Sequence, residues 1–288
     1  MLGETLRQIR EDKDLKMKDV AFNIFSPSQL TRIENGTQIP AADKFFHLLA
    51  RLNVDFEEFA LLSKDESLIS RTHSKRETST LLRSRDRQLI RKQIKKMERF
   101  EQQYQESYFT HLKLILKGYE VLYFEGDVGR ARENVSMVMV YLDSVDKWYF
   151  YELEIFNMLL PFYTIEKAIE LGNLALQNIK LRFQNFKDNE LTRKILTNLA
   201  HLALQNERLM AAYDYSSTAL GLPMTARHLY DSTVARVINQ IVCFKLENGQ
   251  YDPSSVKALI DCFYLLKMDG TAQRLTEFLK EYGIELHV

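Results

Sequence analysis

A short polar stretch near the N-terminus carries side chains suited to hydrogen bonding with a partner outside the protein. It reads SPSQLTRIENG and begins at Ser26. Ser26 is a good N-cap, Pro27 suits a first helical position, and Gln29 can close a capping box onto Ser26. Asn35 and Gly36 are typical of a helix end. The stretch therefore predicts a helix of barely three turns with both ends defined.

Two faces of this helix differ in chemistry. Leu30 and Ile33 form an apolar side, and because so short a helix is marginal alone, they must hold it against neighbouring helices. The other side carries small polar groups and one arginine, whose guanidinium can donate two hydrogen bonds to guanine. This outward side consists of Ser28, Thr31, Arg32 and Asn35.

The elements that must position this helix are short and closely spaced. Apolar residues recur with helical spacing, as in Leu2, Leu6 and Ile9 of the first segment. Two short helices joined by a tight turn, the second presenting small polar side chains, are the arrangement of a DNA-reading motif. We expect a compact domain, 1–63, with helices at 2–12, 17–24, 27–35, 41–52 and 55–62.

The run VAFNIFSPSQLTRIENG resembles the helix-turn-helix of the phage-repressor and Cro-like family, although its turn is one residue shorter. The order of five helices also matches. The resemblance implies base contacts from Ser28 and Arg32, with Gln29 a weaker candidate because capping uses its side chain. It implies phosphate contacts from Lys16 and Asn35.

Charge argues for cooperation between two copies of this domain. Residues 1–36 hold six positive and six negative side chains. Non-specific attraction to phosphates should then be weak, and tight binding should need a dimer. The alternative is that the domain is merely a small helical bundle with a solvated Arg32.

Composition limits the class of the whole chain. With 288 residues, 45% hydrophobic content, 10 Gly and 5 Pro, the chain favours a mostly α-helical protein of about two domains. The formal net charge is zero, and neither a signal peptide nor a membrane span is indicated, so we expect a soluble cytoplasmic protein without membrane contact. Cys243 and Cys262 lie in apolar helical patterns and are predicted to be buried thiols. No pattern predicts a cofactor or a metal.

A boundary follows the first domain. Residues 64–80 lack apolar periodicity and are rich in Ser, Thr and charge, which predicts a linker. Residues 64–104 contain twelve basic and six acidic side chains, a net charge of +6. This basic stretch could add attraction to a nucleic-acid backbone, or it could be a solvated helix face.

The remainder, 81–288, is predicted to be a helical-repeat domain. From about Tyr108 onward, helix–turn–helix hairpins recur, with turns at EGD, QNE and LENGQYD. Such hairpins bury their apolar sides by stacking into a solenoid with a concave face. The pattern resembles tetratricopeptide repeats, with a longer period and few of the consensus residues. The single Trp148 is expected in its core.

One polar residue recurs in this domain. Asn157, Asn198 and Asn239 are 41 residues apart, each on the first helix of a hairpin in an apolar context. An amide side chain can bond one backbone amide of an extended peptide, so a row of them could hold a peptide. Lys194 and Arg236 could hold its carboxylate. Alternatively, the amides pack between helices and the cations are solvated.

Both halves together resemble the Rgg family of peptide-responsive regulators from Gram-positive bacteria. The similarity covers nearly the whole chain and includes the turn length before Ser26, the segment KWYFYE and two of the asparagines. It implies a homodimer that binds double-stranded promoter DNA and responds to a short hydrophobic peptide. Two departures are the lack of a cysteine before Cys243 and the lack of a basic side chain near Asn157.

These observations predict a sequence-specific transcriptional regulator of the quorum-sensing type. A rival reading is a helical-repeat scaffold or regulatory protein that binds a partner protein, with DNA binding that is not sequence-specific. An enzyme is not expected, because no nucleophile–base pair, phosphate loop or metal cluster is recognisable.

Overall fold

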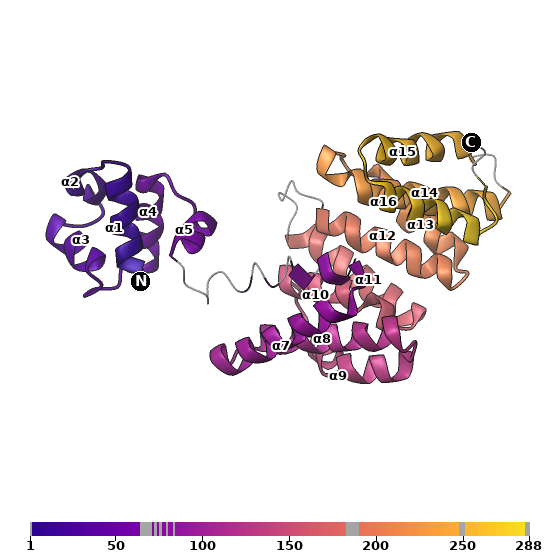
Figure 1. The fold of residues 1–288 in the computed structure, drawn as a ribbon, viewed down its shortest axis with the longest axis horizontal. Helices are drawn as coiled ribbons and strands as arrows, with labels where there is room; N and C mark the ends of the chain where they lie inside the picture. The colour runs from indigo at the N-terminus through magenta and orange to yellow at the C-terminus, as the bar shows by residue number, and fades with distance from the viewer. Residues whose placement is uncertain are drawn as a thin grey trace. The chain divides into compact units, whose positions relative to one another are not determined.

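The computed structural model describes residues 2–63, 71, 74, 77, 78, 80–82, 84–182, 190–247 and 251–285. The chain divides into two compact units, Met1–Leu116 and Lys117–Val288. Every regular element within the described ranges is a helix (Figure 1). The expected all-α class, an N-terminal bundle followed by stacked helical hairpins, is confirmed.

The N-terminal bundle consists of five short helices around one apolar core. Leu6, Leu30, Ile33, Leu48 and Phe59 are almost completely buried in it. The helices are α1 (Leu2–Asp12), α2 (Met17–Ala21), α3 (Pro27–Glu34), α4 (Ala42–Leu52) and α5 (Phe56–Leu62).

The predicted helix positions in this bundle hold to within one residue, with one exception. The second helix ends at Ala21, three residues earlier than expected. Asn23 there takes a positive φ of 59°, a left-handed conformation that stops the helix before the turn into α3.

The stretch after the bundle is helical where it is described. Residues 71, 74, 77, 78, 80–82 and 84 all have helical backbone, and the side chains of Ser74 and Thr78 are fully buried. The described part of the expected linker is therefore helix. Its buried positions are Ser and Thr, so a pattern search for apolar residues does not register them. Asp86 then caps the next helix, α7 (Arg87–Tyr104), by accepting hydrogen bonds from the backbone of Gln88 and Leu89.

Helical hairpins make up the rest of the described residues, and Figure 1 shows α12 to α16 stacked on one another in the second unit. Within the hairpins, α12 packs on α13 and α13 on α14, which gives the repeat its continuous core. The helices are α8 (Ser107–Phe124), α9 (Val128–Ser144), α10 (Phe150–Leu159), α11 (Ile165–Arg182), α12 (Glu190–Gln205), α13 (Leu209–Gly221), α14 (Leu229–Lys245), α15 (Pro253–Leu265) and α16 (Asp269–Glu281), with 3-10 turns at Leu160–Phe162 and Ala226–His228.

Two further expectations concern membrane contact and thiols. Among the residues that the structure describes, none of the helices has the length and apolar character needed to cross a bilayer. Neither cysteine forms a disulfide within the described residues; Cys243 is buried as expected, but Cys262 is exposed. Its prediction was wrong because α15 buries Ile260 and Phe263, and Cys262 lies on the other side of that helix.

Candidate functional site

The third helix begins with the predicted capping box. The backbone N–H of Gln29 donates to Ser26 Oγ at 3.2 Å, and the backbone N–H of Ser26 donates to Gln29 Oε1 at 3.1 Å. Pro27 occupies the first helical position. At the other end Gly36 has a φ of 74°, the left-handed conformation expected of a helix stop. Both ends of α3 are thus fixed by local contacts.

A buried ion pair ties α3 to α1. Arg10 donates from Nε to Glu34 Oε1 at 2.7 Å and from Nη2 to Glu34 Oε2 at 2.9 Å. The two side chains retain only 12% and 3% of their accessible surface. These hydrogen bonds raise the pKa of Arg10 against the opposing effect of burial. Such two-point contacts fix orientation as well as distance.

The same interface brings the two backbones into close contact. A Cβ added to Gly3 of α1 would lie 2.0 Å from the carbonyl oxygen of Ile33. Only glycine therefore allows α1 to approach the last turn of α3 this closely. Together with the buried pair, this contact holds α3 rigidly on the bundle.

The sequence-predicted contact residues lie on the outer side of α3 and at the start of α2. All are exposed except Gln29, which is half-buried because its side chain closes the cap. Thr31 Oγ1 donates to the carbonyl of Pro27 at 2.9 Å, so its hydroxyl is partly used within the helix. The exposed members are Lys16, Ser28, Thr31, Arg32 and Asn35.

Some positioning residues were missed by sequence reasoning. The sequence alone assigns Arg10 no role, yet its guanidinium binds the carboxylate of Glu34. Arg51 of α4 donates to the backbone carbonyls of Asp19 and Phe22, at 3.0 and 3.3 Å, and so satisfies the end of α2. Neither contact has a local signature, since the partners are 24 or more residues apart in the chain.

In the second unit, which contains the helical repeats and is called the repeat unit below, the structure brings two of the three predicted asparagines together. Asn198 of α12 donates from Nδ2 to Asn157 Oδ1 of α10 at 2.9 Å. Asn198 is exposed and Asn157 half-buried, so the pair faces solvent. One amide NH₂ and one amide oxygen of the pair make no further hydrogen bond within the described residues. The pair therefore keeps one donor group and one acceptor, which are the groups needed to bind one backbone peptide group.

The end of α10 that carries Asn157 is held by a buried aromatic cluster. Trp148 is fully buried, as expected, and its ring packs on that of Phe156 at 5.3 Å between centroids. The hydroxyl of Tyr119 donates to the carbonyl of Met158 at 2.8 Å. The residues on both sides of Asn157 are therefore fixed.

The third asparagine has a different environment. Asn239 is 7% exposed and donates from Nδ2 to Ser216 Oγ at 3.1 Å and to Ser217 Oγ at 2.9 Å. Both serines lie on α13, so this amide joins α13 to α14 and its donor is used inside the protein. The structure does not place Asn239 with the Asn157–Asn198 pair.

The two predicted cations also differ. Lys194, one turn before Asn198 on α12, forms an ion pair with Glu190 on the same helix. Arg236 is half-buried on α14 and has no ion-pair partner within the described part of the chain. Of the two, only Arg236 keeps its guanidinium available to donate to an external carboxylate without first breaking an ion pair.

Comparison with known proteins agrees with the geometry of the N-terminal bundle. Residues 6–59 match the family described as helix-turn-helix. The N-terminal bundle is a helix-turn-helix domain. In this domain α2 and α3 are the two helices of the motif, and α3 is the outward one.

Solved structures share the fold over nearly the whole length of the chain, helix-turn-helix domain included. A proposed transcriptional regulator from Listeria monocytogenes EGD-e is 17% identical with a TM-score of 0.76, covering 98% of this chain and 96% of that one. The SHP pheromone receptor Rgg2 of Streptococcus dysgalactiae is 19% identical with a TM-score of 0.69, covering 98% and 99%. PlcR of Bacillus thuringiensis, solved with the peptide PapR7 and DNA, is 17% identical with a TM-score of 0.67, covering 95% and 98%.

Proposed function

We propose that this protein is a sequence-specific DNA-binding transcriptional regulator whose activity is controlled by a short peptide. The observation that carries the proposal is that α3 is held rigidly on the bundle with its polar side exposed. Its ends are capped, the buried Arg10–Glu34 pair ties it to α1, and its polar side is exposed. A helix fixed in this way can enter a major groove without reorganising.

The side chains of α3 divide by role. Arg32 is the residue that specifies sequence, because a guanidinium can pair with two acceptors of guanine. Ser28 and Gln29 contribute weaker base contacts, and Lys16 and Asn35 position the domain on phosphates. These roles agree with a domain that binds as one half of a homodimer.

The peptide is bound by the repeat unit at the Asn157–Asn198 pair. The free donor and acceptor of this pair grip one backbone amide and leave the side chains of the peptide to apolar neighbours. Arg236 receives the peptide carboxylate. The structure of PrgX with the peptide cCF10, 16% identical with a TM-score of 0.68, and that of PlcR with PapR7 and DNA support this direction.

Control by the peptide requires two arrangements of the homodimer. A peptide that binds one arrangement more tightly shifts the population toward it, and only this difference in affinity can change DNA binding. The protein then couples the two sites without any catalytic step.

The test uses the purified full chain, DNA from the region upstream of its gene, and peptides encoded by small open reading frames nearby. The proposal predicts a band shift that survives excess unrelated DNA at physiological salt and that changes when one peptide is added. A scaffold protein would give only a salt-sensitive background shift with every fragment. That result, obtained with the protein as a dimer and with the peptides present, would overturn the proposal.

A further inference from the structure

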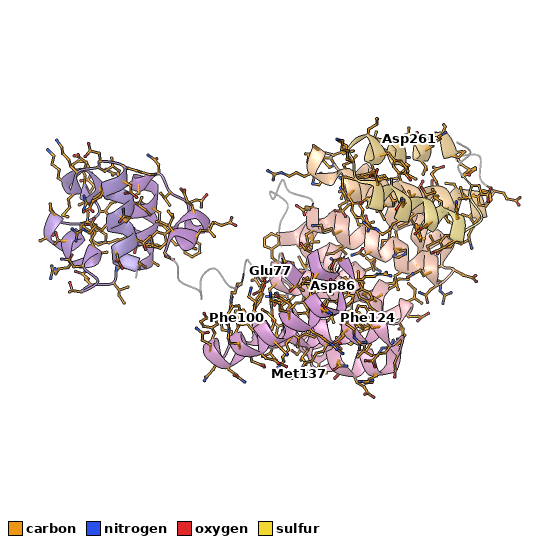
Figure 2. All side chains as sticks on the ribbon, viewed as in Figure 1. Glu77, Asp86, Phe100, Phe124, Met137 and Asp261 are labelled. Carbon is orange, nitrogen blue, oxygen red and sulfur yellow. The ribbon has the colours of Figure 1, made fainter. Side chains whose placement is uncertain are left out.

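A groove of about 760 Å³ runs along α7 in the first unit. Glu77, on the helical stretch before α7, lines this groove, and Figure 2 labels it together with Asp86 just before α7 and Phe100 toward the end of that helix. Leu81 and Leu89 give the groove an apolar end, and Leu89 is 44% exposed. An exposed leucine in a groove indicates a surface that a partner can cover.

Four of the remaining lining residues are basic, and one, Glu77, is acidic. The four basic side chains lie at positions i, i+3, i+4 and i+7 along α7, so they line one side of that helix. Glu77 forms an ion pair with Lys96 at 2.7 Å, and Arg99 lies over the ring of Phe100. Lys92 and Lys95 have no ion-pair partner among the described residues. The four cations are Lys92, Lys95, Lys96 and Arg99.

The outer face of α5 has the opposite character. Glu57 and Glu58 are exposed in its first turn, and Leu61 and Leu62, 51% and 50% exposed, lie in its last turn. The helix carries no basic residue in its last turn. Its first turn therefore presents two carboxylates beside Phe56, which is 46% exposed, and its last turn presents two leucines.

We propose that α5 of one chain docks in the α7 groove of a second copy, with the two helices antiparallel. This orientation places Leu61 and Leu62 on Leu89 and Leu81, and Glu57 and Glu58 beside Lys92 and Lys95. The spacing fits, because at about 1.5 Å per residue the acidic and apolar turns of α5 are about 6 Å apart. Leu89 and the cations at 92 to 96 are separated by about 4.5 to 10 Å.

This contact rests on the homodimer of the proposed function, in which each chain would contact the other in the same way. In a two-fold symmetric dimer, each α5 enters the groove of the other chain, so the contact forms twice. A single exposed ion pair adds little to the stability of a contact. Burial of the exposed leucines would supply most of the stabilisation here. The contact would join the DNA-binding domain of one chain to the start of the repeat region of the other.

The test is cross-linking between two different chains in the full-length protein. A tagged chain carrying Leu62→Cys is co-expressed with an untagged chain carrying Leu89→Cys, both with Cys262→Ser because Cys262 is exposed. The proposal predicts an adduct of tagged and untagged chains with a short bismaleimide. The control replaces Leu89→Cys by Val140→Cys on α9, which is 66% exposed but lies outside the groove, and should give none.

Charge reversal gives an independent second arm. Glu57→Lys with Glu58→Lys in the tagged chain, or Lys92→Glu with Lys95→Glu in the untagged chain, should reduce the adduct to the level of the control. Combining both reversals should restore it. All four side chains are exposed or at the groove surface, and circular dichroism verifies that each variant is folded.

The outcomes separate this contact from the proposed function. If light scattering shows a dimer and no adduct forms between chains, the docking of α5 is wrong while the DNA and peptide sites stand. If a single chain that carries both Leu62→Cys and Leu89→Cys forms a link within itself while the mixed pair of chains forms no adduct, α5 lies in the groove of its own chain, which also overturns the proposal. A monomer would remove both the contact and the homodimer.

Discussion

The helix-turn-helix domain and the repeat unit use buried polar groups in different ways. In the first, Arg10 and Glu34 are buried in order to hold α3, and the polar side chains of α3 stay exposed. In the second, three equally spaced asparagines have two different environments. Asn157 and Asn198 form a pair that faces solvent, whereas the amide of Asn239 is buried and donates to serines of α13. Equal spacing identifies candidate peptide-binding asparagines, but only those whose amide groups are not already hydrogen-bonded inside the protein can bind a peptide.

Arg193 offers the largest effect within the repeat unit. This arginine is 1% exposed, and its guanidinium donates to the carbonyls of Ala219, Leu222 and Pro223 at the end of α13. Arg193→Ala leaves these carbonyls without their donors and should lower the free energy of unfolding by about 3 kcal/mol. Urea denaturation followed by the fluorescence of Trp148 measures it. Arg208→Ala, which removes an exposed pair with Glu166, should change it by less than about 0.5 kcal/mol.

Arg10 is the corresponding test in the helix-turn-helix domain. Arg10→Met leaves Glu34 buried without its partner and should destabilise the domain by about 2 kcal/mol. Circular dichroism is the appropriate measurement, because the chain has one tryptophan and it lies in the repeat unit. Arg7→Met is the control, since the Arg7–Glu11 pair is exposed. Equal effects of the two substitutions would contradict a special role of the buried pair in holding α3.

The asparagines sharpen the comparison directly. Asn198→Ala should weaken peptide binding by about 1 kcal/mol, roughly fivefold, and leave stability unchanged, because its amide is exposed. Asn239→Ala should do the reverse, lowering stability by about 1 kcal/mol with the same peptide affinity. Calorimetric titration with the peptide identified by band shift, together with urea denaturation, measures both. The same changes in peptide affinity and stability for both variants would show that Asn198 and Asn239 have the same role, which would contradict the comparison.

Tyr141 predicts a small effect at high pH. Burial, and then its hydrogen bond to Glu152, raise the pKa of this phenol from 10.0 to about 12. Because the folded pKa is above the unfolded one, the stabilisation is complete below pH 10 and is lost as pH rises toward 12. Tyr141→Phe should therefore lose stability more slowly than the wild-type chain over that range. Urea denaturation at several pH values gives the free energy of unfolding of both chains. If this free energy falls with pH equally steeply in both, Tyr141 makes no such contribution.

The sequence specifies the helix-turn-helix domain closely because its signals are local. The capping box of Ser26 and Gln29, and the stop at Gly36, depend on residues at most a few positions apart. The helical hairpins were equally predictable, since apolar periodicity and turns define them. The burial of Trp148 followed from its apolar context.

Features that depend on distant partners were not predictable. The Arg10–Glu34 pair joins residues 24 apart in the chain, and the serines that bind Asn239 come from another helix. Exposure of Cys262 depends on which side of α15 the neighbouring helices cover. The helical residues near Ser74 bury small polar side chains, which a search for apolar spacing overlooks.

The central claim is that the exposed side of α3 reads DNA sequence, and selection from a pool of random duplexes tests it most directly. The wild-type chain should enrich one two-fold related motif. Arg32→Ala, which is exposed and should fold normally, should lose the preference for guanine at its position, worth about 1–3 kcal/mol of discrimination. Enrichment of the same motif with the same stringency by both proteins would contradict the account.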